Sequence, residues 1–111
     1  MKNNISDRVF DLAIALAKAR NVAYEHIESE DGGTCNFDCP TVRLNRWRES
    51  DVKKACELAG GIYCQKWDGY HYNWHFDCMS GIGNRRTRMA EAFSDKMKEL
   101  GYEASVWYAV D

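Results

Sequence analysis

The stretch IYCQKWDGYHYNWHFDCM, residues 62–79, decides the fold. Two runs rich in aromatic residues, 62–67 and 70–79, stand on either side of the dipeptide Asp68-Gly69. Asp-Gly tolerates the positive φ angles of a two-residue turn, so this pattern is a strong signal for a β-hairpin. We therefore predict two antiparallel strands joined at Asp68-Gly69.

The register of this hairpin decides which side chains share a face. A turn at Asp68-Gly69 pairs Trp67 with Tyr70 and Tyr63 with Trp74, and paired residues point to the same side of a sheet. One face then holds the aromatic residues Tyr63, Trp67, Tyr70, Tyr72, Trp74 and Phe76. The other face holds Ile62, Cys64, Lys66, His71, Asn73, His75 and Asp77. Burying this polar set beneath helices would leave several groups unpaired, at about 1–3 kcal/mol each, so we predict that the aromatic face is the core.

The flanking sequence supplies the other elements of the sheet and its helices. Residues 41–47 alternate between polar and apolar, as a half-buried strand does, and residues 102–110 form a second strand-like run. A short helix, capped by Ser50, ends at Gly60-Gly61. A longer helix of about residues 85–100, capped by Asn84, has one apolar side. Ahead of them all, Ser6 begins an N-terminal helix with an apolar stripe.

Without the N-terminal helix, the order is strand, helix, strand, strand, helix, strand. This is the split βαβ or ferredoxin-like arrangement, with both helices on one face of a four-stranded antiparallel sheet. We predict an α+β fold in one domain, residues 1–111, in which residues 1–31 form the N-terminal helix and an acidic run and residues 41–111 the βαββαβ core. RNA-recognition domains share this order but stack bases on aromatic residues of the open sheet face. Because we place the aromatic residues in the core, we disfavour RNA stacking.

Composition narrows the class of protein and its compartment. The net charge of −2 argues against a protein that coats DNA, which needs excess lysine and arginine. Five cysteines cannot all pair internally, so we expect reduced thiols and a cytoplasmic location. No run approaches the roughly 20 apolar residues of a membrane helix, and the charged N-terminal segment does not have the pattern of a signal peptide.

The turn before the last helix is the first candidate binding site. It contains Gly83, Asn84, Arg85, Arg86 and Arg88. A helix N-terminus carries partial positive charge, so each cation there costs a few tenths of a kcal/mol unless an anion faces it. The anion is either an acidic group, from this chain or a partner, or a phosphate or nucleotide bound by free N–H groups. The loop has no third glycine, so it is not a dinucleotide fingerprint.

The polar sheet face is the second candidate site, and it contains Lys66, His71, Asn73 and His75. One interpretation is a docking surface for a partner. The other is a face that is solvated or covered by the N-terminal helix.

Other chemistry has weaker support. Cysteine and histidine are metal-ligand types, but no Cys-x-x-Cys pair is present. His71 and His75 would lie about 13 Å apart along a strand, too far apart for one zinc ion. No signature surrounds any cysteine that would make it a nucleophile beside His75 and Asp77. We therefore expect no metal, no cofactor and no catalytic residue.

Residues 80–88, with the helix that follows and residues 102–111, resemble the C-terminal end of short uncharacterised proteins of bacteriophages and mobile elements. Small, acidic proteins of this origin are similar to anti-CRISPR and other anti-defence inhibitors. The resemblance implies a non-enzymatic protein that inhibits host nucleic-acid or defence machinery, such as a CRISPR effector, by occupying a protein surface. These inhibitors share no motif, so no residue role carries over. The alternative is a module that binds a small ligand or nucleotide through residues 81–88, and the chain is either a monomer or a homodimer.

Overall fold

The structure, a computed structural model, describes residues 6–28, 32–33, 37–67, 70–81 and 83–109, and for Tyr70 and His71 the backbone alone. The described elements, in chain order, are α1 (Asp7–Tyr24), β1 (Cys39–Arg43), α2 (Glu49–Ala59), β2 (Tyr63–Trp67), β3 (Tyr70–Asp77), α3 (Asn84–Glu99) and β4 (Glu103–Trp107). Asp68-Gly69 and residues 29–31 of the acidic run lie outside the described residues.

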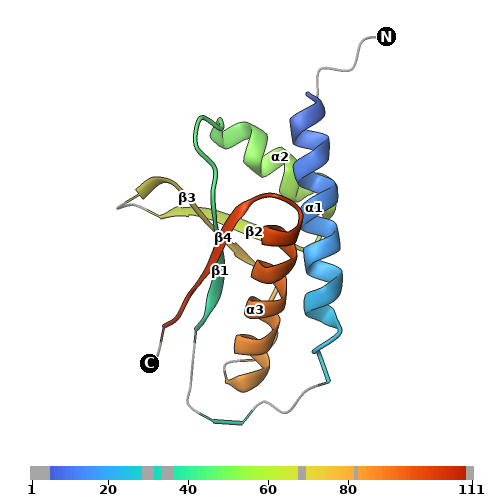
Figure 1. Cartoon of the computed structure of the whole chain (residues 1–111), viewed down its shortest axis with the longest axis vertical. Coiled ribbons are helices and arrows are strands. Elements are labelled where there is room, and N and C mark those ends of the chain that lie inside the picture. Colours follow the sequence, from blue (N-terminus) through green and yellow to red (C-terminus); the bar gives the residue numbers. More distant parts are fainter. Residues whose placement is uncertain (1–5, 29–31, 34–36, 68–69, 82, 110–111) are drawn as a thin grey trace.

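The strands form one four-stranded sheet in the order β2-β3-β1-β4, in which neighbours are antiparallel. This order places the two strands of the hairpin at one edge and β4 at the other, as the ferredoxin-like arrangement requires (Figure 1). The predicted α+β fold, with an antiparallel four-stranded sheet and an additional N-terminal helix, is therefore confirmed.

All three helices share a single core with one face of the sheet. Figure 1 shows α1 and α3 side by side, and α1 also packs against α2. The core residues come from every layer: Leu12, Leu16 and Ala19 from α1, Val52 and Ala55 from α2, Met89, Phe93 and Met97 from α3, and Val42, Trp74 and Phe76 from the sheet. The N-terminal helix therefore extends the helical layer, and α1 does not cover the opposite face of the sheet.

Local signals explain where the helices begin and end. Ser6 is extended and its carbonyl accepts hydrogen bonds from the first turn of α1, as predicted for the residue before the helix. Gly60, with a φ of 81°, ends α2, and the guanidinium of Arg20 in α1 donates to the carbonyl oxygens of Ala59 and Gly60. A cation at a helix C-terminus is favoured by the helix dipole, so Arg20 also ties α1 to α2.

Several boundaries differ from the prediction. The helix α2 begins at Glu49, with Arg48 rather than Ser50 in the capping position. The strand expected at 41–47 runs instead over Cys39–Arg43, because Arg46 has a φ of 65° and turns the chain. The last helix begins at Asn84, with Gly83 rather than Asn84 in the capping position. Such one- or two-residue shifts are ordinary at helix ends.

The predicted register of the hairpin is wrong beyond its first pair. Trp67 pairs with Tyr70 as expected, but Lys66 pairs with Trp74 and Tyr63 with Asp77, because an irregularity falls between Lys66 and Trp67. The partners of β2 residues in β3 are thus displaced by three residues from the predicted pairing. Because three is an odd number, these residues of β2 lie on the opposite face of the sheet from the one predicted.

The face assignment is therefore correct for one strand of the hairpin and wrong for the other. In β3, Trp74 and Phe76 are buried, and Asn73 and His75 face away from the helices, as predicted. In β2, Tyr63 lies on the outside, with 83% of its surface exposed, and Lys66 is on the helix side, where its Nζ lies 4.0 Å from a carboxylate oxygen of Glu49. Lys66 is therefore not part of the polar face predicted for it.

Among the described helices, none combines the length and the apolar character needed to cross a lipid bilayer.

Candidate functional site: the outer sheet face

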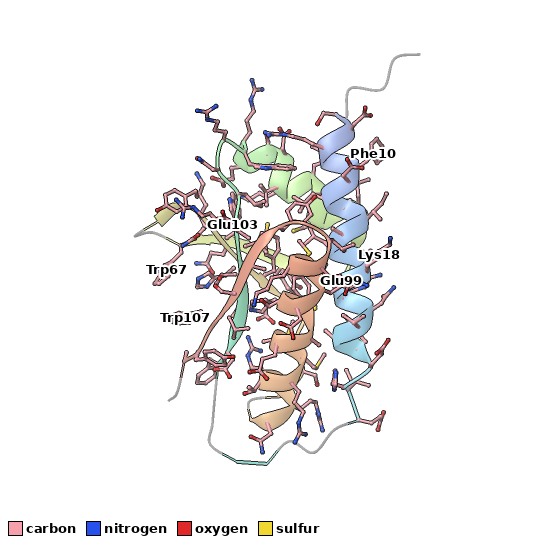
Figure 2. The ribbon with its side chains drawn as sticks, viewed as in Figure 1. Phe10, Lys18, Trp67, Glu99, Glu103 and Trp107 are labelled. Atoms are coloured by element: carbon pink, nitrogen blue, oxygen red, sulfur yellow. The ribbon has the colours of Figure 1, made fainter. Side chains whose placement is uncertain are left out.

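The face of the sheet turned away from the helices, here named the outer sheet face, collects aromatic side chains from three strands. Trp67 in β2, His75 in β3 and Trp107 in β4 form a cluster in which each ring contacts the other two. The ring centroids of Trp67 and His75 are 5.2 Å apart, those of His75 and Trp107 5.3 Å, and those of Trp67 and Trp107 6.0 Å. Figure 2 shows Trp67 and Trp107 on the same side of the molecule, away from Phe10 and Lys18 on α1.

The strand pairing explains how residues far apart in sequence meet here. Thr41 on the central strand β1 pairs with His75 on one side and with Ser105 on the other. Gln65 pairs with His75, which brings β2 into the same row. Alternate residues of each strand point to this face, so Trp67 and Trp107, each two residues beyond a member of this row, lie on the same face as His75.

A hollow of about 470 Å³ lies beside the aromatic cluster. Its walls include the exposed rings of Phe37 and Tyr63 and the cluster residues His75 and Trp107. Cys64, Asp77 and Arg86 also line it. Exposed aromatic rings around a shallow hollow can receive an apolar or aromatic group, so the hollow extends the contact surface of the outer sheet face.

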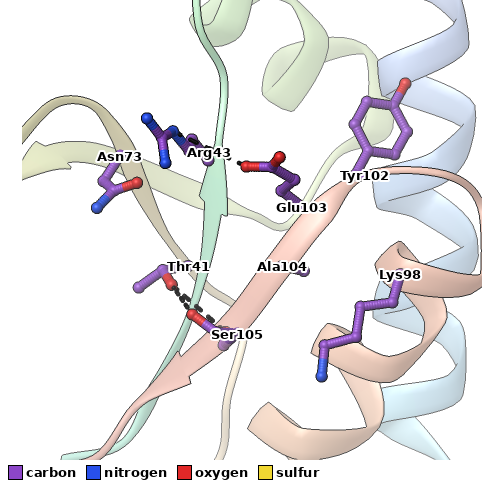
Figure 3. Close-up of a pocket in the computed structure, with 8 residues that line it drawn as sticks. All are labelled: Thr41, Arg43, Asn73, Lys98, Tyr102, Glu103, Ala104 and Ser105. Atoms are coloured by element: carbon purple, nitrogen blue, oxygen red, sulfur yellow. Dashed lines mark hydrogen bonds and ion pairs between the residues drawn. The ribbon is translucent and has the colours of Figure 1, made fainter.

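Most charges on and around this face have partners of opposite sign within the chain. Arg43 lies 3.8 Å from Glu103, and its guanidinium also stacks 4.0 Å from the ring centroid of Tyr72. Figure 3 shows Arg43 and Glu103 on adjacent strands, together with the hydroxyl groups of Thr41 and Ser105, which lie 2.9 Å apart. These residues line a second hollow, of about 400 Å³. The balanced charges leave no strong excess of positive charge on this face.

Burial lowers the pKa of His75 below its ordinary value, because desolvation disfavours the imidazolium form. His75 is consequently neutral at physiological pH and contributes to the cluster as an aromatic ring rather than as a cation.

The arginine turn predicted from sequence is held largely by the chain itself. The backbone N–H of Asn84 donates to the carbonyl of Gly32, and the Gly33 backbone lies so close that a Cβ there would be 2.7 Å from the Asn84 side chain. Gly83 is buried, and Arg85 lies 3.4 Å from the hydroxyl of Ser80. Residues 32–33 thus occupy part of the space in front of this helix N-terminus.

Arg86 has an acidic partner from this chain. Its Nη2 donates to Oδ2 of Asp77 over 3.1 Å, and only 13% of the Arg86 side chain is exposed. The sequence alone leaves open whether the anion at this turn is an acidic side chain or a bound phosphate. For Arg86, the structure shows an acidic side chain of the chain itself, Asp77. Arg88 is exposed.

We expect replacement of Arg86 by methionine to lower the free energy of unfolding by about 1 kcal/mol. The Arg86–Asp77 ion pair should contribute more stability than the median exposed ion pair because Arg86 is largely buried. Its contribution stays modest because Asp77 is half-exposed and solvent screens the pair. Urea unfolding measures the difference. The matched control is Arg88→Met in the same turn, which should stay within about 0.5 kcal/mol of the wild type. Equal effects of the two substitutions would mean that the Asp77 contact contributes nothing.

The structure brings some of the predicted site residues together and separates others. Asn73 and His75 lie on the outer sheet face, Lys66 lies on the helix side, and the side chain of His71 lies outside the described residues. Among the described residues, the arginine turn meets the outer sheet face through Arg86 and Asp77, which both line the first hollow. Among the residues that the structure describes, no group of three or more His, Cys, Asp or Glu side chains could hold a metal ion.

Comparison with protein-family models, with curated proteins and with solved structures gives no match for this chain.

Sequence reasoning missed Tyr63 and Trp67 as surface residues, because it placed both in the core. A signal was present in the unequal lengths of the two runs around Asp68-Gly69, of which 70–79 is the longer. A longer run opposite a shorter one is a sign that the strands do not pair residue for residue along their whole length.

Proposed function

We propose that this chain is a non-enzymatic binding protein that occupies the surface of a protein partner with its outer sheet face. The observation that carries the proposal is the aromatic cluster of Trp67, His75 and Trp107, beside which Tyr63 and Phe37 are exposed. Folding alone gives no reason to place several large rings on the solvent side of a sheet. Tyrosine and tryptophan are the residues most enriched at the energetic centre of protein interfaces.

Charge favours a protein partner over a nucleic acid. A strand of RNA or DNA needs a positively charged track for its phosphates as well as rings on which its bases stack. On this face Arg43 is paired with Glu103, Arg86 is paired with Asp77, and His75 is neutral. The sequence-based reason for disfavouring RNA, that the aromatic residues are inside, does not hold for Tyr63 and Trp67. The reason for disfavouring RNA is now that the charges on this face are paired within the chain.

The class of partner follows from the resemblance of the C-terminal third to phage and mobile-element proteins. We propose that the partner is a nucleic-acid or defence enzyme of a bacterial host, such as a CRISPR effector, and that binding inhibits it in the cytoplasm. A surface inhibitor of this kind needs no catalytic group and no cofactor. It needs a rigid, apolar contact surface, and a four-stranded sheet supported by three helices supplies one.

The alternative, a nucleotide or small anion bound at residues 81–88, has less support. The N–H of Asn84 already donates to Gly32, and Arg86 already contacts Asp77. An incoming phosphate would have to displace these contacts.

The test is affinity capture with matched baits from a bacterial lysate that contains defence proteins. We expect a partner in stoichiometric amounts with the wild-type chain and with Phe10→Ala, which removes an exposed ring from α1, away from the outer sheet face. The double variant Tyr63→Ala/Trp107→Ala should lose that partner. With purified partner, titration calorimetry should show at least about a 30-fold weaker Kd for the double variant, equivalent to about 2 kcal/mol.

Three results would contradict the proposal. The first is a partner that binds the double variant as well as the wild type. The second is recovery of a nucleotide or a single-stranded nucleic acid in place of a protein. The third is self-association through the outer sheet face, seen as a concentration-dependent mass that the double variant abolishes.

A further inference from the structure

Two thiols meet where the last turns of α2 face the edge strand β2. Cys56 is buried in α2, and Cys64 is half-buried on the helix side of β2, one residue into the strand. The chain reverses between them at Gly60 and Gly61, both of which have positive φ angles. Cys56 belongs to the hydrophobic core and Cys64 packs against the same core, which places the two thiols within hydrogen-bonding reach of each other.

We propose that Cys56 and Cys64 are a reversible oxidation site, at which a hydroperoxide converts the two thiols into a disulfide that links α2 to β2. The proposal does not depend on the proposed function: neither thiol belongs to the aromatic cluster, although Cys64 is among the residues that line the hollow beside it. It rests on the juxtaposition of two thiols from different elements and on the unequal environments of the two sulfur atoms.

Cys64 is suited to react first. The hydrogen bond donated by Cys56 and the ammonium of Lys53 both favour the Cys64 thiolate, and together they lower its pKa against the opposing effects of burial and of Glu49. Cys64 is also the more accessible of the two thiols. For Cys56, the hydrogen bond to Cys64 and burial both raise the pKa. Cys56 therefore remains protonated beside Cys64, as a resolving thiol does.

The chemistry balances with one equivalent of hydroperoxide. The Cys64 thiolate attacks the peroxide, an S–O bond forms, the O–O bond breaks, and an alcohol or water leaves after protonation. Cys56 then attacks the sulfenic sulfur, an S–S bond forms, the S–O bond breaks, and water leaves with the Cys56 proton. The two sulfur atoms together lose two electrons to the peroxide, and a thiol reductant restores them.

The chain contains internal controls for this reactivity. Burial beside Asp77 raises the pKa of Cys39 and of Cys78 to about 12 each. The Cys39 thiol also donates a hydrogen bond to the carbonyl of Phe76 over 2.9 Å. Both thiols are expected to react slowly in the folded protein. Cys35 lies outside the described residues, so the experiment uses a Cys35→Ser background.

The test is oxidation of the folded Cys35→Ser chain with hydrogen peroxide, followed by alkylation and peptide mapping. We expect two thiols to disappear, a peptide pair joined through Cys56 and Cys64 to appear, and dithiothreitol to reverse both changes. Cys64→Ser should abolish the loss of two thiols, whereas Cys39→Ser and Cys78→Ser should each retain it. The first mapping requires no substitution at the proposed site, so it is informative even where a variant folds poorly.

A second readout isolates the hydrogen bond. In the reduced native protein, iodoacetamide should modify Cys64 before Cys39 or Cys78, and Cys56→Ala should slow the modification of Cys64 because the donor is gone. Oxidation of Cys64 to a sulfinic acid without a cross-link would overturn the proposal. So would a disulfide that joins other cysteines, or an unchanged rate in Cys56→Ala.

Discussion

Replacement of Phe93 by alanine is expected to lower the free energy of unfolding by about 3–5 kcal/mol. Phe93 lies at the centre of α3, is fully buried, and stacks on Phe76 of β3 with ring centroids 6.2 Å apart. The substitution removes both the buried ring area and the stacking contact, and it leaves a cavity between the helices and the sheet. A domain of this size is stabilised by about 5–15 kcal/mol in total, so the variant loses a large share of its stability.

Urea unfolding at constant pH measures this effect. The control is Ile14→Ala on α1, which truncates an apolar side chain that is 54% exposed. It should change the free energy of unfolding by no more than about 0.5 kcal/mol. If both substitutions cost the same, the core does not lie between α3 and the sheet.

Replacement of Asp38 by alanine is expected to lower the free energy of unfolding by about 3 kcal/mol. Asp38 precedes β1 and is buried, with 1% of its surface exposed. One carboxylate oxygen accepts a 2.6 Å hydrogen bond from the hydroxyl of Thr87 in α3, and the other accepts a 2.9 Å bond from the N–H of Ala109 beyond β4. Removing the carboxylate leaves two polar groups without this acceptor and disconnects three segments of the chain.

The conservative variant Asp38→Asn separates the hydrogen bonds from the rest of the side chain. Its amide oxygen can still accept from Ala109, and its amide nitrogen can donate to the hydroxyl of Thr87. We therefore expect Asp38→Asn to lose about 1 kcal/mol, clearly less than Asp38→Ala, in urea unfolding. Equal losses would show that the charge itself, rather than the hydrogen-bond geometry, is what Asp38 contributes.

Much of the fold was predictable because the signals were local and mutually consistent. The Asp-Gly turn, the Gly60-Gly61 stop and the apolar stripe of α1 each specify an element, and the order of elements leaves few topologies for a sheet of four strands. The tertiary position of α1 was not predictable, because an apolar stripe shows that a helix packs but not on which side of the sheet it packs.

The outer sheet face was predictable only in part, because it depends on register. In β3 the rule of alternation correctly separated Trp74 and Phe76 from Asn73 and His75. The irregularity beside Trp67 reversed the faces of β2, and no residue at that position signals it unambiguously. The aromatic cluster therefore emerges only when the strands are placed in three dimensions, since Trp67, His75 and Trp107 come from three different strands.

The partners of the arginines were also hidden in the sequence. The dipole argument indicated that a cation at this helix N-terminus is favoured by a facing anion, and the structure shows such an anion for Arg86. It could not identify Asp77, because the carboxylate that meets Arg86 comes from the preceding strand and depends on the path of the loop between them.

The central claim is that the outer sheet face is the contact surface, and NMR chemical-shift mapping tests it most directly. Captured partner is titrated into the isotope-labelled chain, and the backbone and tryptophan indole resonances are followed. We predict that the largest shifts fall on the outer sheet face, at Thr41, Tyr63, Gln65, Trp67, His75 and Trp107. Shifts concentrated instead at the arginine turn, residues 83–88, or on the exposed side of α1 would contradict the account.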